Sequence, residues 1–284
     1  MIQRIGLTLL AAIVPSGLFA QATEPPKVLH IVREDIKEGK GPAHAKWEEK
    51  FAQAMVKDKF PVNFIALSSM TGTSQVWFVE ALNSFASVAE AMSFEGRSVD
   101  FASMDAVDGE FRAGSRAILA SYRPDLSYHG TQLMESLPKA RYFNVLTIRI
   151  HFEHDLEFAE LGKIALEAAA KSESNQPVAV YQVVSGMPAG TYLLMEPAAS
   201  LDTLDQAAAR GRALVQAMGE SGFRKFAKGA SEVISTEEST LFTIDPRMSY
   251  VSKEFAAQDP AFWNPKPVKP AHKAKSGEKP AASK

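Results

Sequence analysis

Apolar residues recur along the chain in short runs that are typical of β-strands. The first run of each half is rich in Val, Ile and Leu. Later runs come in pairs separated by short Gly-containing segments, and each such pair predicts a hairpin. The predicted strands are 27–33, 62–68, 75–80, 117–122, 142–150, 178–184, 191–196 and 240–244.

Between these strands, apolar residues recur at three- and four-residue spacing, which predicts helices with one apolar face. The clearest example is 39–59, where Trp47, Phe51 and Met55 follow one another at that spacing. Ser84 and Ser200 are placed to cap a second helix in each half. The other predicted helical stretches are 99–116, 156–170 and 222–234.

The chain contains an internal repeat. Residues 61–91 align with 177–207 without a gap, and six positions are identical. Upstream, 28–31 aligns with 145–148; downstream, 123–128 aligns with 245–250. The identical pairs are Pro61/Pro177, Val62/Val178, Ser69/Ser185, Glu80/Glu196, Ser84/Ser200 and Ala91/Ala207. Three blocks in the same order indicate a duplication.

Each copy has the order β-α-β-β-α-β, which is that of a ferredoxin-like unit. We therefore predict an α+β fold with repeats at 23–130 and 131–255. Four antiparallel strands with helices on one side leave an apolar face that needs a partner. We expect the two sheets to pack face to face as an intramolecular α/β barrel. The alternative is a homodimer, in which each copy finds its partner in another chain.

The two ends of the chain differ from its body. Residues 1–22 have a positive start, an apolar run and the A-x-A motif Ala20-Gln21-Ala22, so a signal peptide cleaved between Ala22 and Thr23 is expected. This predicts export to the periplasm or beyond, with no membrane span after cleavage. Residues 256–284 form a predicted disordered tail rich in Lys, Pro and Ala, which either contacts anionic surfaces or is simply solvated.

Composition narrows the classes of function. The chain has 284 residues, is 46% hydrophobic and carries a net charge of −2, so we expect a folded protein that does not bind nucleic acid. It contains no Cys, which excludes disulfides, thiolate nucleophiles and Cys-ligated metals. A monomer or weak dimer is expected, with a small molecule or an envelope component as partner.

The segment Ile36-Lys37-Glu38-Gly39-Lys40, followed by the Trp47/Phe51 helix and a hairpin that ends at Glu80, resembles the dimeric α/β-barrel superfamily. Within this superfamily the pattern looks like that of antibiotic-biosynthesis monooxygenase and NIPSNAP-like domains, without selecting a specific branch. The resemblance covers most of 27–250. The superfamily includes cofactor-free monooxygenases, isomerases, haem enzymes such as the two-repeat chlorite-dismutase-like proteins, and members without known activity. Fold alone does not select among them.

Strand alternation gives a first candidate site. Leu29 and Ile31 are expected to pack under the helices, which would turn His30 and Arg149 into the barrel. There they could bind an anionic or carbonyl-bearing ligand, with His30 as acid or base. They could equally pair with each other or with nearby carboxylates and only hold the two repeats together.

Four further residues are candidates on the third strands of the two copies. Glu80 and Glu196 occupy equivalent positions and could orient a ligand or serve as a general acid, although a structural role is favoured. Trp77 and Tyr192 could line a small-molecule pocket or belong to the core.

His151 and His154 flank Glu153 in a polar loop and are the candidate metal ligands, although their spacing matches no known zinc motif. No metal or other cofactor is predicted. The main hypothesis is therefore an exported barrel that binds a small molecule or an envelope partner. The alternative is a cofactor-independent monooxygenase or isomerase that uses the barrel cavity. An open cavity with His30 and Arg149 converging in it would favour the enzyme.

Overall fold

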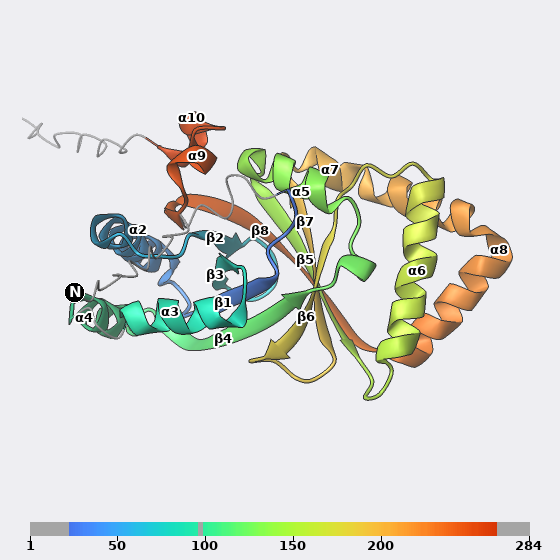
Figure 1. Ribbon diagram of the computed structural model, residues 1–284, viewed down its shortest axis with the longest axis horizontal. Helices are drawn as coiled ribbons and strands as arrows, with labels where there is room; N and C mark the ends of the chain where they lie inside the picture. The colour runs from blue at the N-terminus through green and yellow to red at the C-terminus, as the bar shows by residue number, and fades with distance from the viewer. Residues whose placement is uncertain (1–22, 96–98, 266–284) are drawn as a thin grey trace, which may run out of the picture.

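The computed structural model describes residues 23–95 and 99–265. Eight strands form a closed barrel in the order β1-β3-β2-β8-β5-β7-β6-β4, and every neighbouring pair is antiparallel (Figure 1). The strands are β1 (Val28–Ile36), β2 (Phe64–Ser69), β3 (Gln75–Leu82), β4 (Arg112–Tyr122), β5 (Tyr142–Ile150), β6 (Ala179–Ser185), β7 (Thr191–Ala198) and β8 (Ile234–Tyr250).

The barrel consists of two four-stranded sheets, one from each repeat. The seams between them are β2–β8, where Leu67 pairs with Ile244, and β4–β6, where Ala120 pairs with Val183. The predicted tandem ferredoxin-like fold and the intramolecular barrel are both confirmed.

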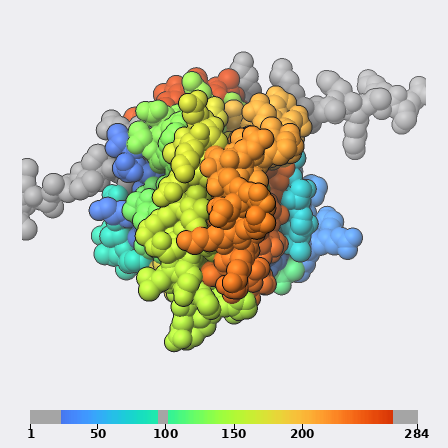
Figure 2. Space-filling view, turned by 90° about the vertical axis from the view of Figure 1, so that its right-hand side faces the viewer, coloured from blue at the N-terminus to red at the C-terminus, as the bar shows by residue number. Residues whose placement is uncertain are grey.

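Helices cover the outside of the barrel. α2 (Gly41–Asp58) and α3 (Phe85–Glu95) pack on the first sheet, and α4 (Val99–Asp108) contacts α2. α6 (Asp155–Lys171) and α8 (Ala207–Val233) lie side by side over the second sheet (Figure 2). None of the described helices is both long and apolar enough to cross a membrane. The short helices are η1 (Pro124–Leu126), α5 (Gly130–Ser136), η2 (Leu137–Lys139), α7 (Asp202–Asp205), α9 (Lys253–Ala256) and α10 (Pro260–Trp263).

The hairpins of the two repeats correspond as the sequence predicts. Phe78 and Leu194 lie in the outer layers, whereas Val79 and Met195 belong to the barrel interior. The predicted alignment of the first strands is shifted by three residues, however. Val32 pairs with Phe78, and it is Leu146 that pairs with Leu194. Val32 therefore corresponds to Leu146, because similar runs of Val, Leu and Ile allow more than one alignment.

The expected orientation of β1 is consequently wrong. Leu29 and Ile31 pack inside the barrel with Ile65 and Val79, not under the helices. The outer layer of the first sheet contains Val28 and Val32 instead. In the second repeat Ile148 packs under the helices, as expected. The β1 residues that alternate with the interior ones, His30 among them, therefore face α2 and α3.

Segments outside the repeats extend the barrel core. Leu133 and Leu137 from α5 and η2, and Phe255 and Trp263 from α9 and α10, join the interior cluster. The Trp263 Nε1 donates a hydrogen bond of 2.8 Å to the Pro138 carbonyl. The predicted boundary of the tail at residue 256 is therefore too early, because Trp263 is buried in the interior cluster. The predicted signal peptide and residues 266–284 lie outside the described residues.

Gly186, in the hairpin between β6 and β7, has a φ of +91° and lies directly against β4, where a Cβ would collide with the Ala117 carbonyl. We expect Gly186→Ala to lower the free energy of unfolding by about 2–3 kcal/mol, because both the backbone and the seam must shift. Thermal or urea unfolding measures this. Gly211→Ala is the matched control, since Gly211 lies in α8 with open space around it; an equal loss there would contradict the explanation.

Candidate functional site

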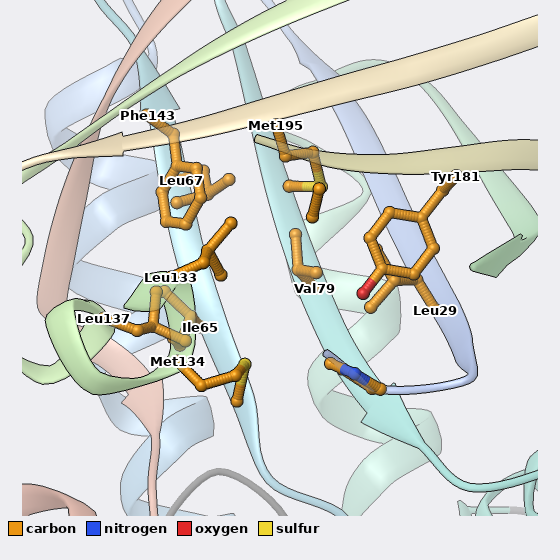
Figure 3. Close-up of a pocket in the computed structure, with 12 residues that line it drawn as sticks. Leu29, Ile65, Leu67, Val79, Leu133, Met134, Leu137, Phe143, Tyr181 and Met195 are labelled. Atoms are coloured by element: carbon orange, nitrogen blue, oxygen red, sulfur yellow. The ribbon is translucent and has the colours of Figure 1, made fainter. Parts of the chain in front are cut away.

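A half-open apolar pocket lies inside the barrel, under α5 (Figure 3). Strand residues from both repeats form its walls, and Leu133, Met134 and Leu137 cover it. The volume of the cavity is about 40 Å³. The walls comprise Pro26, Leu29, Ile65, Leu67, Val79, Phe143, Ala179, Tyr181 and Met195. Among these described lining residues, Tyr181 is the only one that can titrate, and burial raises the pKa of its hydroxyl well above the usual range.

His30 and Arg149 do not converge in this pocket. The His30 Nδ1 lies 2.8 Å from Glu80 Oε2, and both side chains are buried under the helices of the first repeat. Arg149 lies in the second sheet, near the end of β5, and is exposed. The two residues belong to opposite halves of the barrel and to different environments.

The repeated carboxylates have equivalent structural partners. His30 stands opposite Glu80 on the neighbouring strand, and Asn144 stands opposite Glu196. The Asn144 Nδ2 donates a hydrogen bond of 3.3 Å to Glu196 Oε2. Burial raises the pKa of Glu196. Each Glu is thus bonded across the sheet by the polar residue facing it, on the outer side of the barrel.

Neither aromatic candidate lines the pocket. Trp77 belongs to the interior core, where its Nε1 donates to Gln75 Oε1 at 2.7 Å and its ring packs on Phe242. Tyr192 lies in the outer layer of the second repeat, and its hydroxyl donates to Asp155 Oδ1 at 2.7 Å.

The predicted metal ligands His151 and His154 lie before α6 with ring centroids 6.4 Å apart. The His154 Nδ1 is 3.9 Å from Glu157 Oε2. In the part of the chain that the structure describes, 23–95 and 99–265, one group of possible metal ligands converges, and it does not include His151 or His154.

That group is a buried cluster of Glu34, His44, Glu48 and Asp108, which the sequence analysis missed. Glu34 comes from β1, His44 and Glu48 from one face of α2, and Asp108 from the last residue of α4. The four residues are between 1% and 6% exposed. The sequence does contain one sign of this cluster. His44, Glu48 and Ala52 follow one another at i, i+4 spacing, which places them on one face of α2, and that face is buried.

Distances within the cluster are short. His44 Nε2 lies 2.8 Å from Glu34 Oε2, 3.5 Å from Asp108 Oδ1 and 4.0 Å from Glu48 Oε1. Arg112 closes one side, because its Nη1 binds Glu34 Oε1 and its Nε binds Asp108 Oδ2, both at 2.8 Å.

The three carboxyl groups strongly affect one another. Burial, and then the negative charges of Glu34 and Asp108, raises the pKa of Glu48 to about 9. Burial and the charge of Glu34 likewise raise the pKa of Asp108. Glu48 is therefore protonated at neutral pH unless a cation joins the cluster.

The raised pKa of Glu48 predicts how stability depends on pH in EDTA-treated protein. The folded state holds the Glu48 proton up to about pH 9, whereas the unfolded chain releases it near its ordinary value of 4.5. Stability should therefore fall as pH rises between these values, by at most about 1.4 kcal/mol per pH unit. Glu48→Gln should lose less stability over this pH range, because Gln has no carboxyl group to titrate. Urea unfolding at pH 5 and pH 8 checks the prediction, and parallel losses in both proteins would contradict it.

No family model matches the chain, and no curated protein matches it in sequence. Solved structures with a similar arrangement of elements include an anthrone oxidase-like protein, with 10% identity, a TM-score of 0.49, and coverage of 79% of this chain and 93% of the other. A monooxygenase candidate from Fusobacterium nucleatum subsp. nucleatum has 14% identity, a TM-score of 0.49, and coverage of 78% and 93%. A mutant chlorite dismutase from Candidatus Nitrospira defluvii has 12% identity, a TM-score of 0.46, and coverage of 82% and 95%. These values are too low to assign an activity or a ligand to this chain.

Proposed function

We propose that this protein is an exported binding protein that takes up a small apolar molecule, or the alkyl end of a longer one, in the barrel pocket under α5, without turnover. The observation that carries the proposal is the lining itself. Aliphatic, Met and aromatic side chains from both repeats surround the pocket. Such a surface favours apolar ligands, since their transfer from water releases about 25 cal/mol per Å².

The position of the titratable groups supports binding over catalysis. His30 and Glu80, the pair suited to acid–base work, are bonded to each other outside the barrel. The Tyr181 hydroxyl keeps its proton, because burial raises its pKa. A cofactor-independent enzyme that works by proton transfer needs a group that accepts a proton from its substrate, and among the described residues the pocket walls offer none.

The size of the pocket limits the ligand. About 10–15 Å³ of such volume holds one water molecule, so the pocket as it stands holds only a few heavy atoms. Its half-open mouth suits a slender chain with its polar end left outside. Met134 and Met195, which are unbranched and flexible, can adjust around such a chain.

1-Butanol is a suitable probe, because its short apolar chain matches a pocket that holds only a few heavy atoms and its hydroxyl can remain at the mouth. We expect saturable binding by calorimetry and a higher Tm in its presence. Ala179→Leu fills the pocket and should weaken binding roughly tenfold or more. Ala168→Leu, which adds the same volume to a buried site in α6, is the matched control.

Equal affinity in wild type and Ala179→Leu would contradict the proposed site. Absence of saturable binding by the wild type would contradict the proposed function. Export is a separate part of the proposal, supported by the composition of residues 1–22. Mass spectrometry of the protein from the periplasm or medium should show a chain that starts at Thr23.

A further inference from the structure

The buried cluster of Glu34, His44, Glu48 and Asp108 has the dimensions of a metal coordination shell. One atom from each residue lies within 4.8 Å of the others, and the distances from His44 Nε2 are 2.8, 3.5 and 4.0 Å. Four ligands held about 2.0–2.2 Å from one ion in a tetrahedral shell are separated by roughly 3.4 Å. The distances from His44 Nε2 scatter around this value, so small movements of the side chains would bring the four atoms into one shell.

The second repeat shows that the fold does not require charged residues at this place. β1 and β5 correspond with an offset of 114 residues, set by the pairing of Val32 with Phe78 and of Leu146 with Leu194. α2 and α6 keep the same offset, since Gly41 and Asp155 start them. Glu34 then corresponds to Ile148, His44 to Phe158 and Glu48 to Gly162.

In the second repeat this position is ordinary apolar core. Ile148 and Phe158 are buried there with Leu161 and Val180. Burying ionised groups costs several kcal/mol each, and ion pairs such as those with Arg112 often do not repay this in full. The first repeat thus carries a costly arrangement that its duplicate replaces with packing, which points to a specific use of the charges.

Arg112 leaves the cluster incompletely satisfied. It binds Glu34 Oε1 and Asp108 Oδ2, so that Glu34 Oε2 and Asp108 Oδ1 remain on the side of His44. Asp108 is 3% exposed, and among the described residues its Oδ1 gains a donor only while Glu48 is protonated and donates to Asp108. The imidazole Nε2 has one hydrogen at most, and Glu34 lies at the shorter distance. When Glu48 is ionised, this buried Asp108 oxygen has no donor, and a bound cation would satisfy it together with the Glu48 carboxylate.

Charge also matches a divalent cation. The three ionised carboxylates of the cluster carry three negative charges, and Arg112, which also binds the exposed Asp105, together with one divalent ion carries three positive charges. We propose that Glu34, His44, Glu48 and Asp108 bind one divalent first-row transition-metal ion of the Mn²⁺ or Zn²⁺ class. One imidazole nitrogen and three carboxylate oxygens suit these ions better than Cu⁺, which prefers thiolate or thioether ligands.

The position of the site indicates a structural role. Four protein ligands from a strand and two helices fill it, and a structural metal site is closed in this way. The ion would tie β1, α2 and α4 together on the outside of the first sheet. This inference is independent of the apolar pocket, which lies on the other face of that sheet.

The experiment uses the full chain, freed of metal with EDTA and titrated with MnCl₂ and, separately, ZnCl₂ by calorimetry. We expect one ion per chain and a Tm that rises with metal concentration. Glu48→Gln removes one ligand but keeps the shape of the protonated side chain, so the metal-free variant should fold. It should bind roughly tenfold more weakly or worse.

Glu80→Gln is the matched control, because Glu80 is a buried carboxylate of the same sheet outside the cluster. It should bind metal with the affinity of the wild type. The proposal is overturned if the wild type shows no saturable binding, or if Glu48→Gln binds as tightly as Glu80→Gln. The latter result would place any bound ion elsewhere, for example at His151 and His154.

Discussion

Each four-stranded sheet of this protein has two apolar faces but helices on only one of them. The uncovered faces contain residues such as Ile31 and Leu67 in the first repeat and Val145 and Leu193 in the second, all buried against one another. The seams β2–β8 and β4–β6 then close the structure into a barrel, so that each of its eight strands has a neighbour on both sides. The filled barrel interior and the position of the polar groups follow from the way in which each sheet covers the apolar face of the other.

One consequence is that the barrel interior is mostly filled. Large side chains such as Trp77, Phe242 and Tyr181 occupy it, and the space that is left lies where α5 covers the strands. Polar groups are displaced to the layer between sheet and helices. There the two repeats have diverged, because packing in the second is apolar around Phe158, whereas the first buries His44 among three carboxylates.

The fold could be predicted because it depends on properties that the sequence displays directly. Strand and helix periodicity, together with the ungapped alignment of the two hairpins, specified the order of elements and the need for a second sheet. The orientation of β1 could not be predicted, because all of Val28-Leu29-His30-Ile31 is buried and alternation therefore gives no signal. The candidate site depended on that orientation. In the cluster, Glu34, His44 and Glu48 come from neighbouring elements, but Asp108 is distant in the chain and reaches them only because α4 packs against α2.

Native-state hydrogen exchange tests most directly whether the two sheets form one cooperative unit. If they do, the most protected amides of β1 and β5 should exchange with the same free energy of opening, equal to that of global unfolding. The paired amides at the seams β2–β8 and β4–β6 should belong to the same class. Separate opening of one repeat, with its strands exchanging while the other stays protected, would contradict the account.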